Sequence, residues 1–156
     1  MKKRRIMFVC HGNICRSPMA EFIFKRLLEE NGIAGEFTVE SSATSYEEVY
    51  DGIGNPVYPN ARAELQKHGI SCDGKRAAKL QYTDYDEYDL FIGMDEANIR
   101  NMRMIFGSDP ECKIKKLMDY TSRGGNVADP WYTRDFGVTY RDILDGCTAL
   151  LEELLK

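Results

Sequence analysis

The stretch "IMFVC", from Ile6 to Cys10, is an uninterrupted run of apolar residues close to the start of the chain. A strand that is buried on both faces has this pattern, and such strands occur in parallel sheets that helices cover on both sides. The turn-forming stretch His11–Arg16 follows at once, and a helical pattern follows the turn. A strand that passes through a short turn into a helix predicts an α/β fold.

The rest of the chain repeats this order of strand and helix. We predict further strands over Glu36–Ser41, Tyr88–Met94 and Cys112–Tyr120, and helices from Pro18 up to Gly32 and over Asn60–Gly69, Glu96–Gly107 and Thr139–Lys156. The expected fold is a four-stranded parallel sheet flanked by helices on both faces, and residues 1–156 are expected to form one domain. Two loops rich in turn residues, Ser42–Pro59 and Thr121–Val138, are long enough to carry function.

Charge and cysteine content limit the classes of function. The net charge of −4 argues against a general nucleic-acid-binding protein. No apolar stretch approaches the length of a membrane span, and the start "MKKRRIMFVCHG" is too short in apolar residues for a signal peptide, so no membrane insertion is expected. The odd number of five cysteines argues against a disulfide framework and favours a reducing, cytoplasmic location. We expect a monomer or a weak dimer.

The stretch "VCHGNICRSPMAE", from Val9 to Glu21, combines residues suited to binding an oxyanion. Backbone N–H groups in a turn before a helix form an anion cradle, and Gly12 would allow a close backbone approach. The Arg16 guanidinium can hold two oxygens of a phosphate. These groups should favour the thiolate of Cys10, which would then lie beneath the phosphate for in-line attack. Ser17 can donate a hydrogen bond to that thiolate, and the Asn13 amide can brace the loop.

A proton donor should assist the departure of a phosphorylated group, and two Asp-Pro pairs are candidates. Asp109 follows a helix without aromatic neighbours, which favours a structural turn. Asp129 follows the last predicted strand and precedes Trp131 and Tyr132, whose rings could grip a phenyl group. Because the carboxyl ends of parallel strands meet at one edge, the Cys10 loop, the loop after the second strand and "DPWY" should converge there.

The stretch "VCHGNICRSPMAE" resembles the active-site loop of the low-molecular-weight protein tyrosine phosphatases, whose pattern is V-C-x-G-N-I-C-R-S-P. The segments "SSATS", "GNPVYPNA", "KHGI", "DLFIGMD" and "ADPWY" continue the similarity in family order over nearly the whole chain. The resemblance implies a phosphocysteine mechanism on phosphotyrosine-containing proteins, with no cofactor or metal. It implies that Cys10 is the nucleophile, Arg16 the phosphate clamp and Asp129 the general acid. The residues implied to bind the substrate are His11, Gly12, Asn13, Ile14, Cys15, Ser17, Trp131 and Tyr132.

The resemblance also implies supporting roles. Ser41 and His68 match family positions that form a polar network with Asn13 behind the loop. Without the resemblance, the sequence around His68 would indicate a histidine at the C-terminus of a helix, where the helix dipole favours it. Cys15 could form a reversible disulfide with Cys10 that protects it from oxidation, a redox role that the resemblance favours. Cys72, Cys112 and Cys147 are expected to pack in the interior, and His11 to be solvated. The loop from Thr44 to Tyr58 should form part of the pocket rim.

Four alternatives to a tyrosine phosphatase can be compared with the sequence. Arsenate reductases on this scaffold need two further cysteines after the third strand, where "LFIGMDEANIRNM" has none. A protein-arginine phosphatase typically has Thr before the second cysteine of the loop, whereas the residue here is Ile14. A phosphate-binding module without catalysis could lose the nucleophile or the acid, yet both are present. A metal site formed by Cys10, His11 and Cys15 matches no common zinc spacing.

Overall fold

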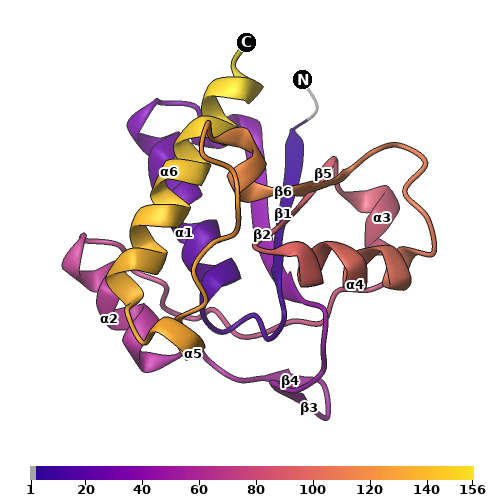
Figure 1. The fold of residues 1–156 in the computed structure, drawn as a ribbon, viewed down its shortest axis with the longest axis horizontal. Helices are drawn as coiled ribbons and strands as arrows, with labels where there is room; N and C mark the ends of the chain where they lie inside the picture. Colours follow the sequence, from indigo (N-terminus) through magenta and orange to yellow (C-terminus); the bar gives the residue numbers. More distant parts are fainter. Residues whose placement is uncertain (1–2) are drawn as a thin grey trace.

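The computed structural model describes residues 3–156 and has a four-stranded parallel sheet with helices on both faces (Figure 1). The strand order in this sheet is β2-β1-β5-β6, and every neighbouring pair is parallel. Its strands are β1 (Arg4–Cys10), β2 (Phe37–Ala43), β5 (Leu90–Gly93) and β6 (Ile114–Lys116). The predicted fold class is confirmed. Met1 and Lys2 of the basic start lie outside the described residues, and Lys3 is exposed.

The apolar run in β1 is explained by the two-sided burial of the central strand. Ile6, Phe8 and Cys10 belong to the hydrophobic cluster on one face of the sheet, and Met7 and Val9 belong to the cluster on the other face. Because side chains alternate along a strand, every residue of the run meets one of the two clusters. Cys10 is the last residue of the strand, so the packing of β1 determines where its thiol emerges.

The helices form two layers. Helices α1 and α6 pack against each other on the face that holds Ile6 and Phe8, and α4 covers the opposite face (Figure 1). The helical segments are α1 (Arg16–Glu30), α2 (Pro59–Lys67), α3 (Asp84–Glu87), α4 (Glu96–Phe106), α5 (Pro130–Thr133) and α6 (Phe136–Leu154), with 3-10 turns at Ala34–Glu36 and Leu117–Tyr120. No helix within residues 3–156 is long and apolar enough to cross a membrane.

Several predicted boundaries differ from the structure. The strand predicted over Cys112–Tyr120 ends at Lys116, because the chain turns into a 3-10 helix in which Leu117 and Met118 are fully buried. The first helix begins at Arg16, two residues before Pro18, so the proline lies in its first turn. The two predicted loops contain short elements: α5 lies in the second, and the first contains an antiparallel hairpin of β3 (Val49–Tyr50) and β4 (Ile53–Gly54).

The β3–β4 hairpin lies at the end of the molecule where β1 ends (Figure 1). Gly54 allows this position: a Cβ atom there would lie 1.8 Å from the carbonyl oxygen of Ala77. A bridge between Pro56 and Arg76 continues this contact. The hairpin is therefore held against the main body by backbone that only glycine can approach so closely.

Helix α4 begins at Glu96, shortly after β5 ends at Gly93, with Asp95 as its N-cap residue. The Asp95 carboxylate accepts a hydrogen bond from the backbone N–H of Asn98, and the Asn98 side chain accepts one from the backbone N–H of Asp95. This capping box starts α4, and Gly107, with φ of 79°, ends it. Asp95 is thus fixed at the carboxyl end of β5, beside the end of β1.

Candidate active site

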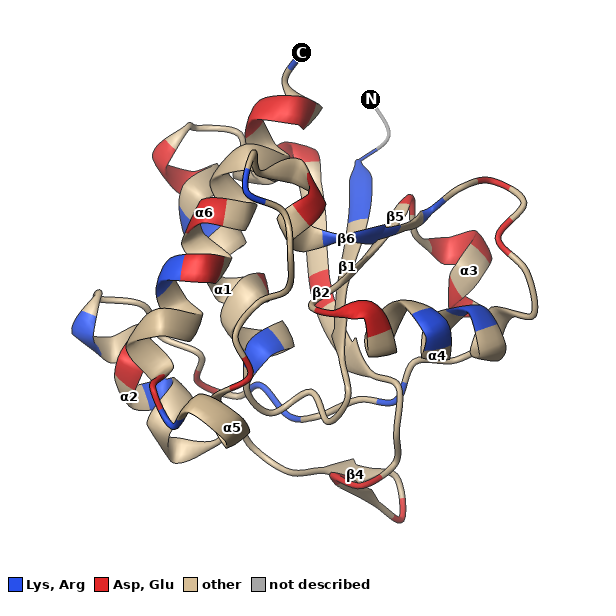
Figure 2. Cartoon of the chain, in the orientation of Figure 1, with Lys and Arg blue, Asp and Glu red and all other residues tan. Residues whose placement is uncertain are grey.

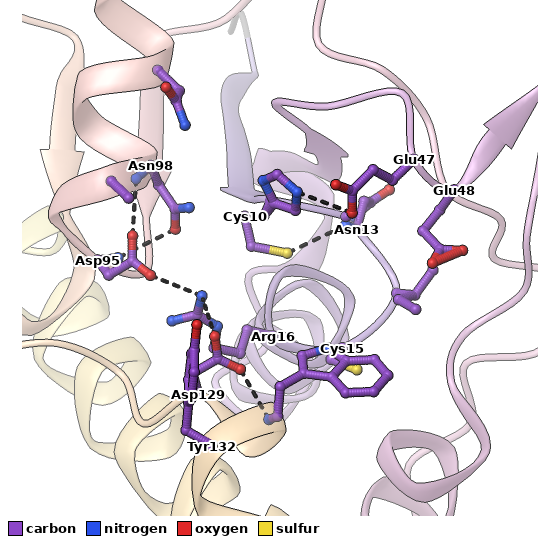
Figure 3. Close-up of a pocket in the computed structure, with 16 residues that line it drawn as sticks. Cys10, Asn13, Cys15, Arg16, Glu47, Glu48, Asp95, Asn98, Asp129 and Tyr132 are labelled. Carbon is purple, nitrogen blue, oxygen red and sulfur yellow. Dashed lines mark hydrogen bonds and ion pairs between the residues drawn. The ribbon is translucent and has the colours of Figure 1, made fainter.

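A cavity of about 500 Å³ lies at the carboxyl ends of β1 and β5 (Figure 3). Three walls of this cavity come from the Cys10–Arg16 turn, from Glu47 and Glu48 in the loop after β2, and from Asp129, Trp131 and Tyr132. The predicted convergence of three loops is therefore confirmed. A fourth wall was not predicted: it comes from the start of α4 and includes Asp95 and Asn98. Figure 3 shows these two residues on the opposite side of the cavity from Glu47 and Glu48.

The Cys10 sulfur lies at the base of the turn and meets two hydrogen-bonding groups. The backbone N–H of Asn13 donates to Sγ at 3.3 Å, and the Ser17 hydroxyl oxygen lies 3.0 Å from Sγ. Asn13 adopts the left-handed conformation, with φ of 59°, that turns its N–H toward the sulfur. Gly12 has no positive φ, so the left-handed residue of this turn is Asn13 and not the neighbouring glycine.

The Asn13 side chain braces the turn, as predicted. Its Oδ1 accepts from the backbone N–H of Ala78 at 3.0 Å, so its Nδ2 is the donor. Nδ2 donates to the hydroxyl oxygen of Ser17 at 2.7 Å and to that of Ser41 at 2.9 Å. Asn13, Ser17 and Ser41 are each at most 2% exposed, so water does not compete for these bonds.

A buried carboxylate that the sequence pattern did not indicate, that of Glu21, sets the direction of these bonds. Ser41 donates its hydroxyl hydrogen to Glu21 at 2.6 Å, and the Glu21 side chain, which is 5% exposed, also meets the ammonium groups of Lys25 at 2.6 Å and Lys75 at 3.5 Å. Because the Ser17 oxygen accepts from Asn13, its own hydrogen remains available to Cys10. The chain of bonds therefore places a hydrogen-bond donor against the Cys10 sulfur.

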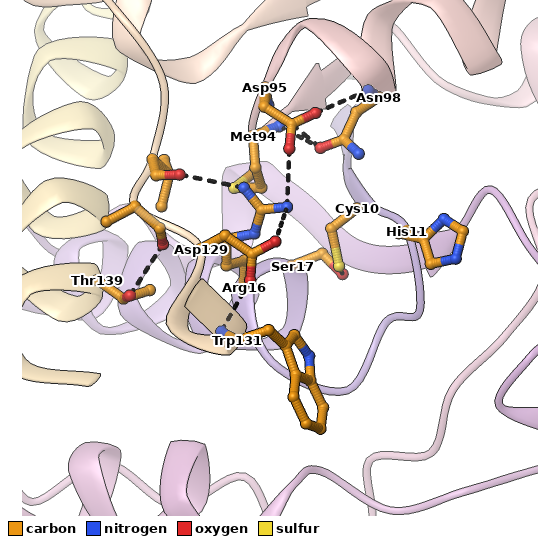
Figure 4. A network of polar contacts seen from close by, with 12 residues as sticks. Cys10, His11, Arg16, Ser17, Met94, Asp95, Asn98, Asp129, Trp131 and Thr139 are labelled. Carbon is orange, nitrogen blue, oxygen red and sulfur yellow. Dashed lines mark hydrogen bonds and ion pairs between the residues drawn. The ribbon is translucent and has the colours of Figure 1, made fainter. Parts of the chain in front are cut away.

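Arg16 is 6% exposed, and its guanidinium is held by three oxygens (Figure 4). Its Nη2 lies 2.8 Å from Asp95 Oδ2 and 3.6 Å from Asp129 Oδ2, and its Nη1 donates to the backbone carbonyl of Val127 at 3.1 Å. A buried arginine needs such partners, and they fix the direction of the guanidinium at the cavity wall. The "GMD" stretch, in which β5 ends at Gly93, could have indicated Asp95, because Asp95 follows a buried strand end as the Cys10 turn does.

Asp129 is the N-cap residue of the short helix α5. Its Oδ1 accepts from the backbone N–H of Trp131 at 3.0 Å, which leaves Oδ2 directed toward Arg16. The Trp131 and Tyr132 side chains line the cavity and are 60% and 87% exposed. Asp109, the other Asp-Pro residue, accepts hydrogen bonds from Tyr85 and from the backbone of Lys113, which confirms its structural role.

The remaining loop residues differ in exposure. The His11 ring is solvated, as predicted, and its Nε2 lies 3.1 Å from the exposed Glu47 carboxylate. Ile14 is 9% exposed and lines the cavity. Within residues 3–156, no group of three or more His, Cys, Asp or Glu side chains could hold a metal ion.

The cysteines of this chain are free thiols. Burial, followed by the nearby charges of Cys10 and Asp129, raises the pKa of Cys15 to about 12, so this thiol keeps its proton at neutral pH. Cys72 and Cys147 are buried, as predicted. The prediction for Cys112 was wrong: it is exposed, in the turn before β6, with φ of 52°.

His68 does not join the network of Asn13. Its Nε2 contacts Glu64 at 3.1 Å, and its ring stacks on Tyr140 with centroids 3.7 Å apart. The reason is its place at the end of α2, which packs against α6 and so brings the ring onto that helix. Of the two predicted network residues, Ser41 contacts Asn13, and Glu21 rather than His68 meets the far side of Ser41.

The fold and the cavity together define an α/β protein with the Cys10 thiol at the base of a turn that lines the cavity. The family model described as "Low molecular weight phosphotyrosine protein phosphatase" matches residues 5–156, and the chain belongs to this family of hydrolases that act on phosphotyrosine. Neither the arginine phosphatase nor the arsenate reductase alternative is favoured by this assignment.

Relatives in distant organisms cover nearly the whole chain. The low molecular weight protein-tyrosine-phosphatase YfkJ of Bacillus subtilis is 37% identical over 97% of this chain and 96% of its own length. The crystal structure of YfkJ has a TM-score of 0.93 and covers 99% of this chain and 96% of its own. The low molecular weight phosphotyrosine protein phosphatase of Rattus norvegicus is 34% identical over 96% of this chain and 95% of its own.

Proposed function

We propose that this enzyme hydrolyses phosphotyrosine in proteins through a phosphocysteine intermediate on Cys10. The observation that carries the proposal is the thiol of Cys10 at the base of the turn, beside two hydrogen-bond donors and within a cavity that Arg16 also lines. In-line attack on phosphorus needs a sulfur nucleophile at the base of the site and a cradle that holds the phosphate above it.

In the first step the Cys10 sulfur attacks phosphorus, the S–P bond forms and the P–O bond to tyrosine breaks. The Asp129 carboxyl group donates its proton to the departing phenol oxygen. In the second step the Asp129 carboxylate takes a proton from water, the water oxygen attacks phosphorus, and the S–P bond breaks to release inorganic phosphate. One carboxyl group thus acts in turn as acid and as base. The distance of 3.6 Å between Asp129 and Arg16 supports this role.

Arg16 is the phosphate clamp, and the backbone of His11, Gly12, Asn13, Ile14 and Cys15, with Ser17, forms the cradle. Trp131 and Tyr132 contact the phenyl ring of the substrate, for which their exposed rings at the cavity are suited. Cys15 is the redox partner that closes a disulfide with oxidised Cys10. The reaction needs no metal or organic cofactor. Free thiols at all five cysteines support a cytoplasmic location.

The test is phosphate release from a phosphotyrosine peptide in the presence of EDTA and a reductant. Phosphoserine and phosphoarginine peptides are assayed in parallel, together with the Cys10→Ser and Asp129→Asn variants. Metal-independent release from phosphotyrosine that Cys10→Ser abolishes is expected. Trapping of a phosphoenzyme by rapid acid quench, present in wild type and absent in Cys10→Ser, checks the intermediate. Equal release by wild type and Cys10→Ser would refute the mechanism.

A further inference from the structure

A second cavity adjoins the first and has a volume of about 520 Å³. The two cavities share three lining residues, which are Ile14, Glu48 and Trp131. The outer walls of the second cavity come from the segment between β4 and α2, including Pro56 and Val57, and from α2 itself. Figure 1 shows α2, α5 and the β3–β4 hairpin together at the end of the molecule where β1 ends.

Contacts that involve no ligand hold this second cavity open. The backbone N–H of Tyr58 donates to the Ile14 carbonyl at 2.8 Å, which ties the outer wall to the phosphate-binding turn. The Tyr58 ring packs on Trp131, with centroids 5.2 Å apart, and stacks on Phe136 at 6.0 Å. The Asn55 side chain donates to the Glu48 carboxylate at 2.7 Å. Because these walls are already held in place, binding of a side chain in the second cavity loses little conformational entropy of the protein.

The chemistry of the walls is mainly apolar. Ile14, Pro56, Val57 and the Trp131 ring surround the space, and Val57 is only 6% exposed. Charge lies at the margins: the Glu48 carboxylate stands at the wall shared with the first cavity, and Arg62 lies on α2, where Asp73 pairs with it at 2.6 Å. An acidic side chain entering from the first cavity would meet Glu48, whereas an apolar side chain would bury its surface.

From this continuity we infer that the second cavity is a subsite for a large apolar side chain close to the phosphotyrosine in the protein substrate. The inference rests on the proposed function. If the phosphorylated ring of a substrate fills the first cavity, the residues next to the phosphotyrosine lie beside Ile14 and Trp131, which line both cavities. The cavity is larger than one aromatic side chain needs, so it accommodates leucine, methionine or phenylalanine with adjoining backbone. The enzyme thus selects phosphotyrosines with an apolar neighbour over those with an acidic one.

The test uses phosphotyrosine peptides on an alanine and glycine background, in which Phe, Leu or Glu is placed singly at each position flanking the phosphotyrosine. Wild type is compared with Gln66→Trp, which fills the outer end of the second cavity from an exposed position of α2. The matched control is Lys67→Trp, an exposed residue of α2 that does not line the cavity. Each protein is also assayed on free phosphotyrosine, which does not reach the subsite.

In wild type, Phe or Leu at one flanking position should raise kcat/KM about tenfold over glycine, and Glu there should give no gain. Gln66→Trp should lose this preference and keep its activity on free phosphotyrosine, whereas Lys67→Trp should retain both. A wild type without apolar preference, or a preference that survives in Gln66→Trp, overturns the subsite while the phosphatase activity stands. Failure of wild type to release phosphate from any of the phosphotyrosine peptides overturns the proposed function and the subsite together.

Discussion

The free energy of unfolding of this protein should depend strongly on one side chain in the turn after Cys10, that of Asn13. Its amide makes three buried or half-buried hydrogen bonds, to Ser17, Ser41 and Ala78. At about 1 kcal/mol net for each bond, their loss lowers the free energy of unfolding by about 3 kcal/mol. The backbone of Asn13 also has the left-handed conformation, with φ of 59°. An alanine at this position would adopt that conformation at a cost of about 1 kcal/mol more than a glycine.

Asn13→Gly should therefore lose about 3 kcal/mol and Asn13→Ala about 4 kcal/mol, out of a total that is about 5–15 kcal/mol for a domain of this kind. The measurement is urea unfolding followed by far-UV circular dichroism. Asp51 provides a matched control, because it is exposed and has φ of 49° without such a network. Asp51→Ala should be less stable than Asp51→Gly by about 1 kcal/mol, and neither variant should show the further loss expected at position 13.

Two results would refute this reasoning. A loss below about 1 kcal/mol in Asn13→Gly would mean that the three hydrogen bonds are replaced by water at no cost. Equal stability of the glycine and alanine variants at position 13, with a clear difference at position 51, would mean that the turn relaxes out of the left-handed conformation once the amide is removed.

Three further expectations concern other residues of the site and its surroundings. Asp129→Asn keeps a side-chain cap for α5 but cannot transfer the proton. The kcat of this variant should therefore fall about a hundredfold or more, while its binding of vanadate is retained. An unchanged kcat would show that Asp129 is not the general acid. Gly54→Ala should displace the β3–β4 hairpin, because the new Cβ would lie 1.8 Å from the Ala77 carbonyl oxygen, and hydrogen exchange at the hairpin should rise above that of wild type. Burial raises the pKa of Cys15 from 9.0 to about 12, so this thiol loses its proton at lower pH in the unfolded chain than in the folded protein. The free energy of unfolding should therefore fall as the pH rises from 9 to 12, and it should fall less steeply in Cys15→Ala. The same dependence on pH in wild type and Cys15→Ala would contradict the raised pKa of Cys15.

The fold could be predicted because its determinants are local. The apolar run of β1 and the periodic apolar residues of the helices each reflect burial against one layer, which the sequence displays directly. The strand expected after Lys116 was wrong because "LMDY" is apolar enough for either a strand or a tight helical turn. Burial of Leu117 and Met118 decides between them, and a pattern of apolar residues alone does not reveal it.

The site could be predicted where one short stretch holds its parts, as from Cys10 to Ser17. The partners that reach this stretch from elsewhere were harder to find. Glu21 resembles a solvent-facing residue of an amphipathic helix, and only the tertiary structure brings Ser41 and Lys75 onto it. His68 was misplaced for the same reason, since the packing of α2 on α6 determines what its ring meets.

The rigidity of the turn around Cys10 has a consequence for the end of the catalytic cycle. The groups that orient Arg16, Asn13 and Ser17 are all parts of the protein, so the proposed phosphate cradle should have the same shape before the substrate binds and after the phenol leaves. Free inorganic phosphate presents the same oxygens to the same donors as the ester does. Product should therefore compete with substrate, and the rate inside a cell should fall as the phosphate concentration rises, so that the same architecture that prepares the enzyme for attack also makes it responsive to its own product.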